Sequence, residues 1–146
     1  MPTLAETFAA PAKRPIVVSD CCTMIDQEVD SKGGLSGLAI KGGYKLVKGF
    51  KPGFIPDVVE ALLPDFCTAL QPIVDDARKQ SRPIGSFFNS SRDRVAEALL
   101  AITDDRAKRS KHGTVKATYE RLRGMAKKNV EEAVPRVGAL IEKHAG

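Results

Sequence analysis

Apolar residues recur at spacings of three and four along most of this 146-residue chain, which is the period of one face of an α-helix. No segment alternates apolar and polar residues, and neither Asn-Gly nor Asp-Gly marks a hairpin. The sequence therefore predicts an all-α fold. The longest run starts after Thr114, and its apolar positions are Val115, Tyr119, Leu122, Ala126, Val130, Ala133, Val137 and Leu140.

Glycine and proline divide this pattern into segments, and we expect a compact single-domain bundle of five to seven helices. Prolines at positions 56, 64 and 72 predict either one kinked helix or successive short helices, each beginning at a proline. Pro135 is expected to kink or split the last helix for the same reason. The order in which the helices pack does not follow from one sequence.

The first residues are expected to stand apart from this bundle. Residues 1–14 predict a mobile N-terminal arm with one short turn, opened by a capping box from Thr3 to Glu6. Residues 15–146 form the helical domain. Its first helix would start at Pro15 and face Ile16 and Ile25 inward.

The stretch "SKGGLSGLAIKGGYKLVKGFKPGF", residues 31–54, holds seven of the twelve glycines. A phosphate-binding loop would need lysine directly after the second glycine of its pattern, and Gly43 stands there instead. Helix packing explains the glycines better, because a neighbouring backbone can approach closely where side chains are missing. The predicted packing residues are Ala39, Gly42 and Gly43.

Lysines line one side of the same predicted helix, and they form a secondary basic stripe of Lys41, Lys45, Lys48 and Lys51. The main basic cluster lies nearer the C-terminal end of the sequence. Between positions 106 and 128 there are nine Lys or Arg residues and one acid, Glu120. The nine are Arg106, Lys108, Arg109, Lys111, Lys116, Arg121, Arg123, Lys127 and Lys128.

Catalytic chemistry has little support in the sequence. Only two histidines occur, and the three cysteines, Cys21, Cys22 and Cys67, match neither a disulfide framework nor a zinc pattern. The acid pairs Asp75–Asp76 and Asp104–Asp105 diverge on a helix and suggest solvated faces. We therefore expect no enzyme, no metal site and no cofactor.

The run "DQEVDSKGGLSGLAIKGGYKLVKGFKPGFIPDVVEALLPDF", together with "DRVAEALLAITD" and "KKNVEEAVPRVGALI", resembles a family of small uncharacterised bacterial proteins. The resemblance covers most of the chain. It implies a free-standing helical domain in bacteria. It transfers no activity and no catalytic residue.

These observations favour a cytoplasmic protein that acts by binding. The first candidate partner is nucleic acid or a ribonucleoprotein, held at the main basic cluster by phosphate-led contacts. The main alternative is a structural subunit that uses its glycine-rich helix for self-association or for a protein partner. A weaker alternative is peripheral attachment to an anionic membrane. No apolar run reaches the roughly 18 residues of a membrane span.

Overall fold

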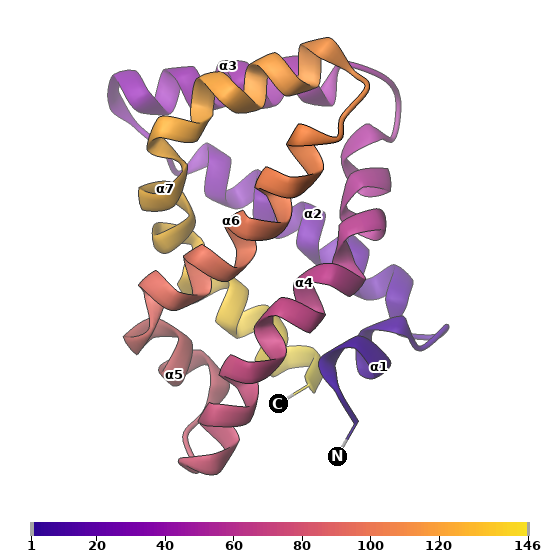
Figure 1. Cartoon of the computed structure of the whole chain (residues 1–146), viewed down its shortest axis with the longest axis vertical. Helices are drawn as coiled ribbons and strands as arrows, with labels where there is room; N and C mark the ends of the chain where they lie inside the picture. Colours follow the sequence, from indigo (N-terminus) through magenta and orange to yellow (C-terminus); the bar gives the residue numbers. More distant parts are fainter. Residues whose placement is uncertain (1, 146) are drawn as a thin grey trace.

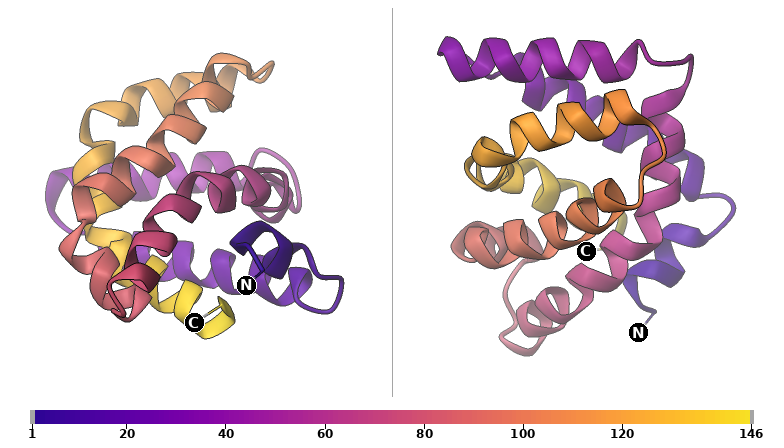
Figure 2. Two further views of the ribbon diagram at one scale, coloured as in Figure 1. Left: turned by 60° about the horizontal axis from the view of Figure 1, so that its bottom comes forward. Right: turned by 45° about the horizontal axis from the view of Figure 1, so that its top comes forward.

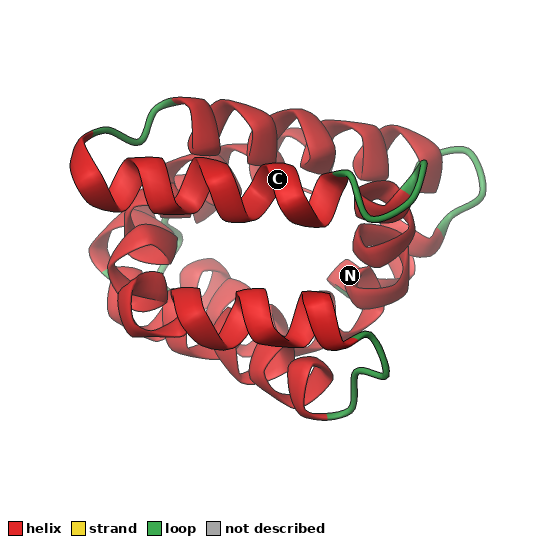
Figure 3. Ribbon diagram, turned by 90° about the horizontal axis from the view of Figure 1, so that it is seen from above, coloured by secondary structure: helices red, strands yellow, loops and turns green. Residues whose placement is uncertain are grey.

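The computed structural model describes residues 2–145, and within that range the chain forms seven α-helices and no strand (Figures 1 and 3). This confirms the predicted all-α fold with five to seven helices. Short loops join the helices, and two of them, residues 31–33 and 49–53, contain glycines of the glycine-rich stretch. The helices are α1 (Leu4–Ala9), α2 (Arg14–Asp30), α3 (Gly34–Lys48), α4 (Phe54–Lys79), α5 (Ile84–Ser90), α6 (Arg92–Lys108) and α7 (Gly113–Ala145).

Helix α1 differs from the expected mobile arm because it is packed into the core. The capping box is present, with Thr3 Oγ1 accepting from the Glu6 N–H and the Glu6 carboxylate accepting from the Thr3 N–H. Leu4 and Phe8, one turn apart, are both buried. The Leu4 N–H also donates to Gln71 Oε1 at 2.7 Å. A pair of large apolar side chains at this spacing buries enough surface to hold a short helix in place.

Helix α4 is continuous through Pro64 and Pro72, so of the two expected arrangements the structure shows one helix. Both prolines are exposed, and their missing N–H groups lie on the solvent side, where the helix tolerates longer hydrogen bonds by curving. The other side is strongly apolar. It contributes Leu63, Cys67, Leu70, Ile73, Val74 and Ala77 to the main core.

Helix α7 runs through the whole molecule and contains Pro135. Its first half crosses one end beside α3, and its second half turns toward α5 (Figure 1). At α5 the two backbones approach closely. A Cβ atom placed on Gly138 would lie 3.0 Å from the Gly85 Cα. Phe88, which is fully buried, packs at the same crossing.

The C-terminal end of α7 is fixed to the N-terminal helices. The ring of His144 is buried, and its Nε2 lies 2.7 Å from the carboxylate of Asp20 in α2. The Lys13 ammonium donates to the His144 carbonyl at 2.8 Å, and Phe8 packs edge-on against the imidazole. Hydrogen bonds from Lys143 and His144 lower the pKa of Asp20.

Helix α3 occupies the opposite end of the molecule from α5, as Figure 2 shows from a second direction. The first half of α7 and the loop before it lie at this same end. The loop after α3 and the loop before α7 are joined there by an aromatic cluster, in which the Phe50 ring packs edge-on against Phe54 and tilted against His112, at centroid distances of 5.2 and 4.9 Å. The fold thus gathers the two basic segments of the sequence at one end.

Candidate anion-binding end of the molecule

Helix α3 is bounded by glycine at both ends, with Gly33 as its N-cap and Gly49 as its C-cap. Its inner side is fixed to α2 by a hydrogen bond of 2.5 Å from the Tyr44 hydroxyl to the Asp26 carboxylate. This bond lowers the pKa of Asp26. Burial and the nearby carboxylate raise the pKa of Tyr44, so the phenol stays protonated and keeps donating.

The contact between α3 and α7 is made at Gly43. A Cβ atom at this position would lie 2.8 Å from Leu122 Cδ1 and 3.3 Å from Thr118 Cγ2. Glycine here lets the two helices approach closely, as the packing hypothesis requires. The structure differs from that hypothesis at Gly42 and Ala39. Both are exposed, and a Cβ on Gly42 would meet nothing within 4 Å.

The outer side of α3 carries an exposed apolar stripe. Its members and their exposed fractions are Leu35 (86%), Leu38 (68%), Leu46 (48%) and Phe50 (38%), the last just beyond the helix. In the described part of the chain, Ile16 in α2 is the one other large apolar residue that is exposed. Positions 35, 38, 42 and 46 fall on one side of a helix, so Ala39 and Gly42 lie within the stripe.

Lysines flank this stripe on the side toward α2. Lys48 forms a 3.4 Å ion pair with Asp26. Lys41 and Lys45 are exposed and form no ion pair with any described residue. The surrounding segment has no acidic residue between Asp30 and Asp57. Lys41 and Lys45 beside the apolar stripe are therefore not neutralised by any acid of their own segment.

Four members of the main basic cluster are neutralised within the fold. Arg123 donates two hydrogen bonds to Asp104, at 2.7 and 2.9 Å, and Lys127 pairs with both Asp93 and Glu97, at 2.6 and 2.8 Å. The other two pairs are Arg109–Asp105 and Arg106–Asp65, the latter at a long 3.9 Å.

The Asp104 site is the most connected of these. Its carboxylate accepts from Arg123 and from the Tyr119 hydroxyl, and these bonds lower the pKa of Asp104. Burial and the same carboxylate raise the pKa of Tyr119 to about 12. Asp104 therefore holds α6 against α7, which differs from the solvated face expected from its sequence.

The remaining five members of the cluster have no ion pair with any residue from 2 to 145; they are Lys108, Lys111, Lys116, Arg121 and Lys128. Lys128 borders the groove between α3 and α7, where it lies near Ser36 and Gly37. Arg121 is exposed and immediately precedes Leu122, the residue that contacts Gly43. Both cations thus belong to the part of α7 that packs beside α3.

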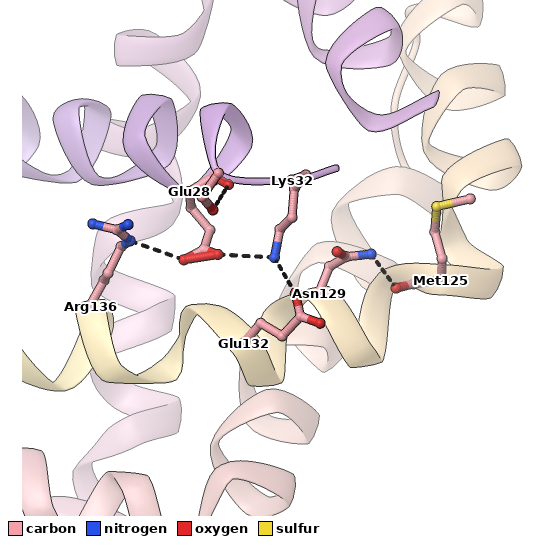
Figure 4. Close-up of polar contacts among 7 residues, drawn as sticks. Glu28, Lys32, Met125, Asn129, Glu132 and Arg136 are labelled. Carbon is pink, nitrogen blue, oxygen red and sulfur yellow. Dashed lines mark hydrogen bonds and ion pairs between the residues drawn. The ribbon is translucent and has the colours of Figure 1, made fainter. Parts of the chain in front are cut away.

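The groove between the start of α3 and α7 encloses about 220 Å³ and is mostly polar. On its floor, the Lys32 ammonium lies 2.9 Å from Glu28 and 2.8 Å from Glu132, and Glu28 also pairs with Arg136 (Figure 4). Burial by itself would lower the pKa of Lys32, but the bonds to Glu132 and Glu28 raise it. Lys32 is therefore occupied by the carboxylates of Glu28 and Glu132 and is not free to pair with an external anion.

Two features of this end were missed by the sequence reasoning. Four acidic residues of α6 neutralise members of the cluster, and three of them, Asp93, Glu97 and Asp104, have spacings of four and seven that place them on one helix side. That spacing could have predicted from the sequence that an acidic side of this helix pairs with the basic cluster. The apolar stripe could not be predicted as clearly, because apolar or small residues cover α3 on every side except that of its lysines, and periodicity alone does not say which of them face inward.

The side chains with reactive groups lie elsewhere. Burial raises the pKa of Cys21 and of Cys67 to about 12, so these thiols stay protonated. Among residues 2–145, no group of three His, Cys, Asp or Glu side chains is placed to hold a metal ion. None of the helices in that range is both long and apolar enough to cross a membrane.

Comparison with known proteins assigns the chain to a family without assigning it an activity. No curated protein matches it, and no solved structure matches it. The model of one family covers nearly the whole chain, from residue 4 to residue 145. The chain therefore belongs to DUF6918, a family of unknown function.

Proposed function

We propose that this is a non-catalytic protein that binds a phosphate-bearing anionic partner through the end formed by α3 and the start of α7. The observation that carries the proposal is the set of exposed cations at this end that have no ion pair among the described residues. They come from two segments far apart in sequence. The exposed members are Lys41, Lys45, Lys51, Lys108, Lys111, Arg121 and Lys128, and the half-buried Lys116 joins them.

Binding of this kind is driven by charge. Each phosphate that a Lys or Arg neutralises releases condensed counterions, so affinity falls as salt rises. Cations already paired within the fold, such as Arg123 and Lys127, contribute less because a partner must compete with Asp104, Asp93 and Glu97. The effective surface is therefore smaller than the nine-residue cluster and includes part of α3.

Two sources could supply the phosphates: a nucleic acid, free or in a ribonucleoprotein, and the headgroups of an anionic membrane. Few aromatic residues are available to stack on bases, since they make up 5% of the chain. Nucleic-acid binding would therefore depend on the backbone and show little sequence preference.

The test is a salt titration of the full chain against labelled duplex DNA, structured RNA and anionic lipid vesicles. We expect binding at low salt to at least one probe, with affinity falling steeply as salt rises. The double variant Arg121→Glu/Lys128→Glu should weaken this binding by at least about tenfold, from two lost contacts and their reversed charge. Absence of binding to all three probes at low salt would overturn the proposal.

A matched control separates local contact from net charge. Lys79 and Arg92 are exposed cations without an ion pair among residues 2–145, and they are the last residue of α4 and the first residue of α6, on either side of α5. The variant Lys79→Glu/Arg92→Glu changes net charge by the same amount. It should retain most of the binding. Equal loss in both double variants would mean that only overall charge matters, which contradicts a defined site.

A further inference from the structure

We propose that α3 is a membrane-docking helix whose exposed apolar stripe enters the interfacial layer of an anionic bilayer while the flanking cations contact lipid phosphates. The inference rests on the proposed function and selects lipid headgroups as the source of its phosphates. It is drawn from one juxtaposition, in which the most exposed leucines of the described chain share one short helix with Lys41 and Lys45, two exposed lysines without an ion pair among residues 2–145.

The stripe has the dimensions of an interfacial helix. From Leu35 to Leu46 the helix rises about 16 Å, at roughly 1.5 Å per residue. Leu35 and Leu38 are 86% and 68% exposed, so their side chains are available without any change in the fold. A helix of this kind lies in the plane of the interface, with its apolar side in the boundary between headgroups and acyl chains.

Charge around the stripe complements an anionic surface. Lys41 and Lys45 are exposed on α3 itself, and Lys128 of α7 borders the groove beside the start of α3. The α3 segment has no acidic residue between Asp30 and Asp57 that would be repelled by lipid phosphates. Long lysine and arginine side chains can keep their charges at headgroup level while the apolar residues go deeper.

The same charges and leucines disfavour the two other candidate partners of the stripe, a second copy of this chain and a nucleic acid. Two copies of α3 packed antiparallel about a two-fold axis would bring Lys41 and Lys45 against the same two residues of the second copy, with no acid in the segment to offset them. A nucleic-acid backbone would use the lysines and leave Leu35 and Leu38 exposed to water. A bilayer uses both the charges and the leucines.

Gly42 provides a gain-of-binding test. It lies in the middle of the stripe, and a side chain added there would meet nothing within 4 Å. Gly42→Leu would fill the gap between Leu38 and Leu46 without disturbing the packing at Gly43. If the stripe enters lipid, this variant should bind anionic vesicles several-fold more tightly than the wild-type chain, because it adds one leucine to the buried surface.

The experiment is sedimentation of the full chain with vesicles of phosphatidylcholine alone or of phosphatidylcholine with phosphatidylserine. We expect the wild-type chain to sediment with the anionic vesicles only. Leu35→Ser/Leu38→Ser should reduce this binding by at least about tenfold although every charge is kept. Ile16→Ser, which removes the exposed apolar residue of α2, is the matched control and should bind as the wild type does.

Each contrary outcome has a distinct meaning. Binding to DNA or RNA without binding to vesicles would overturn this inference and leave the proposed function standing. Vesicle binding that is unaffected by both the Leu35→Ser/Leu38→Ser and Gly42→Leu changes would also overturn it, because charge would then be sufficient. A salt-tolerant dimer dissociated by Leu35→Ser/Leu38→Ser would assign the stripe to a second copy. Absence of binding to every anionic probe would remove both proposals.

Discussion

Helices α3 and α5 both pack on α7 through a glycine contact, but α5 buries its large apolar side chains whereas α3 exposes most of its own. The seven residues of α5 bury Ile84, Phe87 and Phe88. The fifteen residues of α3 bury only two, and both are glycines, Gly37 and Gly43. Helix α5 is thus part of the main core, whereas α3 is attached by close backbone contact and leaves its leucines outside.

This difference indicates how stability is distributed. Burial of apolar area is the dominant favourable term in folding, so the end that holds α5 should contribute most of it. The α3 end is held instead by the approach at Gly43 and by polar contacts such as Tyr44–Asp26 and Arg123–Asp104. A region with few buried apolar contacts is expected to open more readily than the core.

The largest effect should come from the α5 side. Phe88 is 0% exposed, and Phe88→Ala would leave a cavity between α5, α7 and their neighbours. We expect the free energy of unfolding to fall by about 3–5 kcal/mol, as for other buried phenylalanines. Urea titration followed by circular dichroism measures this loss. A loss below about 1 kcal/mol would mean that α5 is not part of the core.

The α3 contact can be tested with two adjacent glycines. Gly43→Leu forces a side chain into Leu122 and Thr118, and we expect it to cost about 1–3 kcal/mol through overpacking. Gly42→Leu meets open space, and it should leave stability unchanged or raise it by up to about 1 kcal/mol through better helix propensity. The measurement is the thermal unfolding of the two variants side by side, which compares their stabilities. Equal effects would contradict the observed orientation of α3.

A smaller, pH-dependent effect is expected at Asp104. Its pKa is lowered mainly by the hydrogen bond from Arg123, so its contribution to stability is complete above the unfolded-state pKa of about 3.9 and is lost as pH falls through the lower folded-state value. Because the site is partly exposed, we expect Asp104→Asn to cost about 1 kcal/mol at pH 7.

The measurement is the free energy of unfolding of wild type and Asp104→Asn across the acidic range. The difference between the two should be constant near neutral pH and shrink as the medium becomes more acidic than about pH 4. A difference that persisted at low pH would mean that Asp104 acts through packing. Asp75→Asn offers a matched control, because Asp75 is exposed and accepts only from its helical neighbour Gln71.

Much of the fold could be predicted from the sequence because helical periodicity and capping are local. The capping box at Thr3–Glu6 and the core side of α4 are examples. It is harder to tell from the sequence which of two adjacent apolar residues is buried. Ile16 was expected to face inward, but it is 54% exposed, and Val17 beside it is the buried residue of α2.

The candidate site could be predicted less well because it depends on contacts distant in sequence. The main cluster was identified by composition, yet which of its cations are neutralised was decided by where α6 lies against α7. Arg123 and Lys127 face the acids of α6, whereas Arg121 and Lys128 do not. In α3, the contact at Gly43 also determines which apolar residues face outward.

The smallest effect on stability is expected at the apolar stripe. Leu38 is 68% exposed, so Leu38→Ser removes little buried area and should change the free energy of unfolding by less than about 0.5 kcal/mol. Thermal unfolding of this variant beside Phe88→Ala completes the comparison of the two helices. A loss near 2 kcal/mol would show that Leu38 is buried in solution, either within the fold or against another copy. If the loss is negligible, the fold does not require leucine at this position, and contact with a partner becomes the physical reason for an exposed leucine beside a row of lysines.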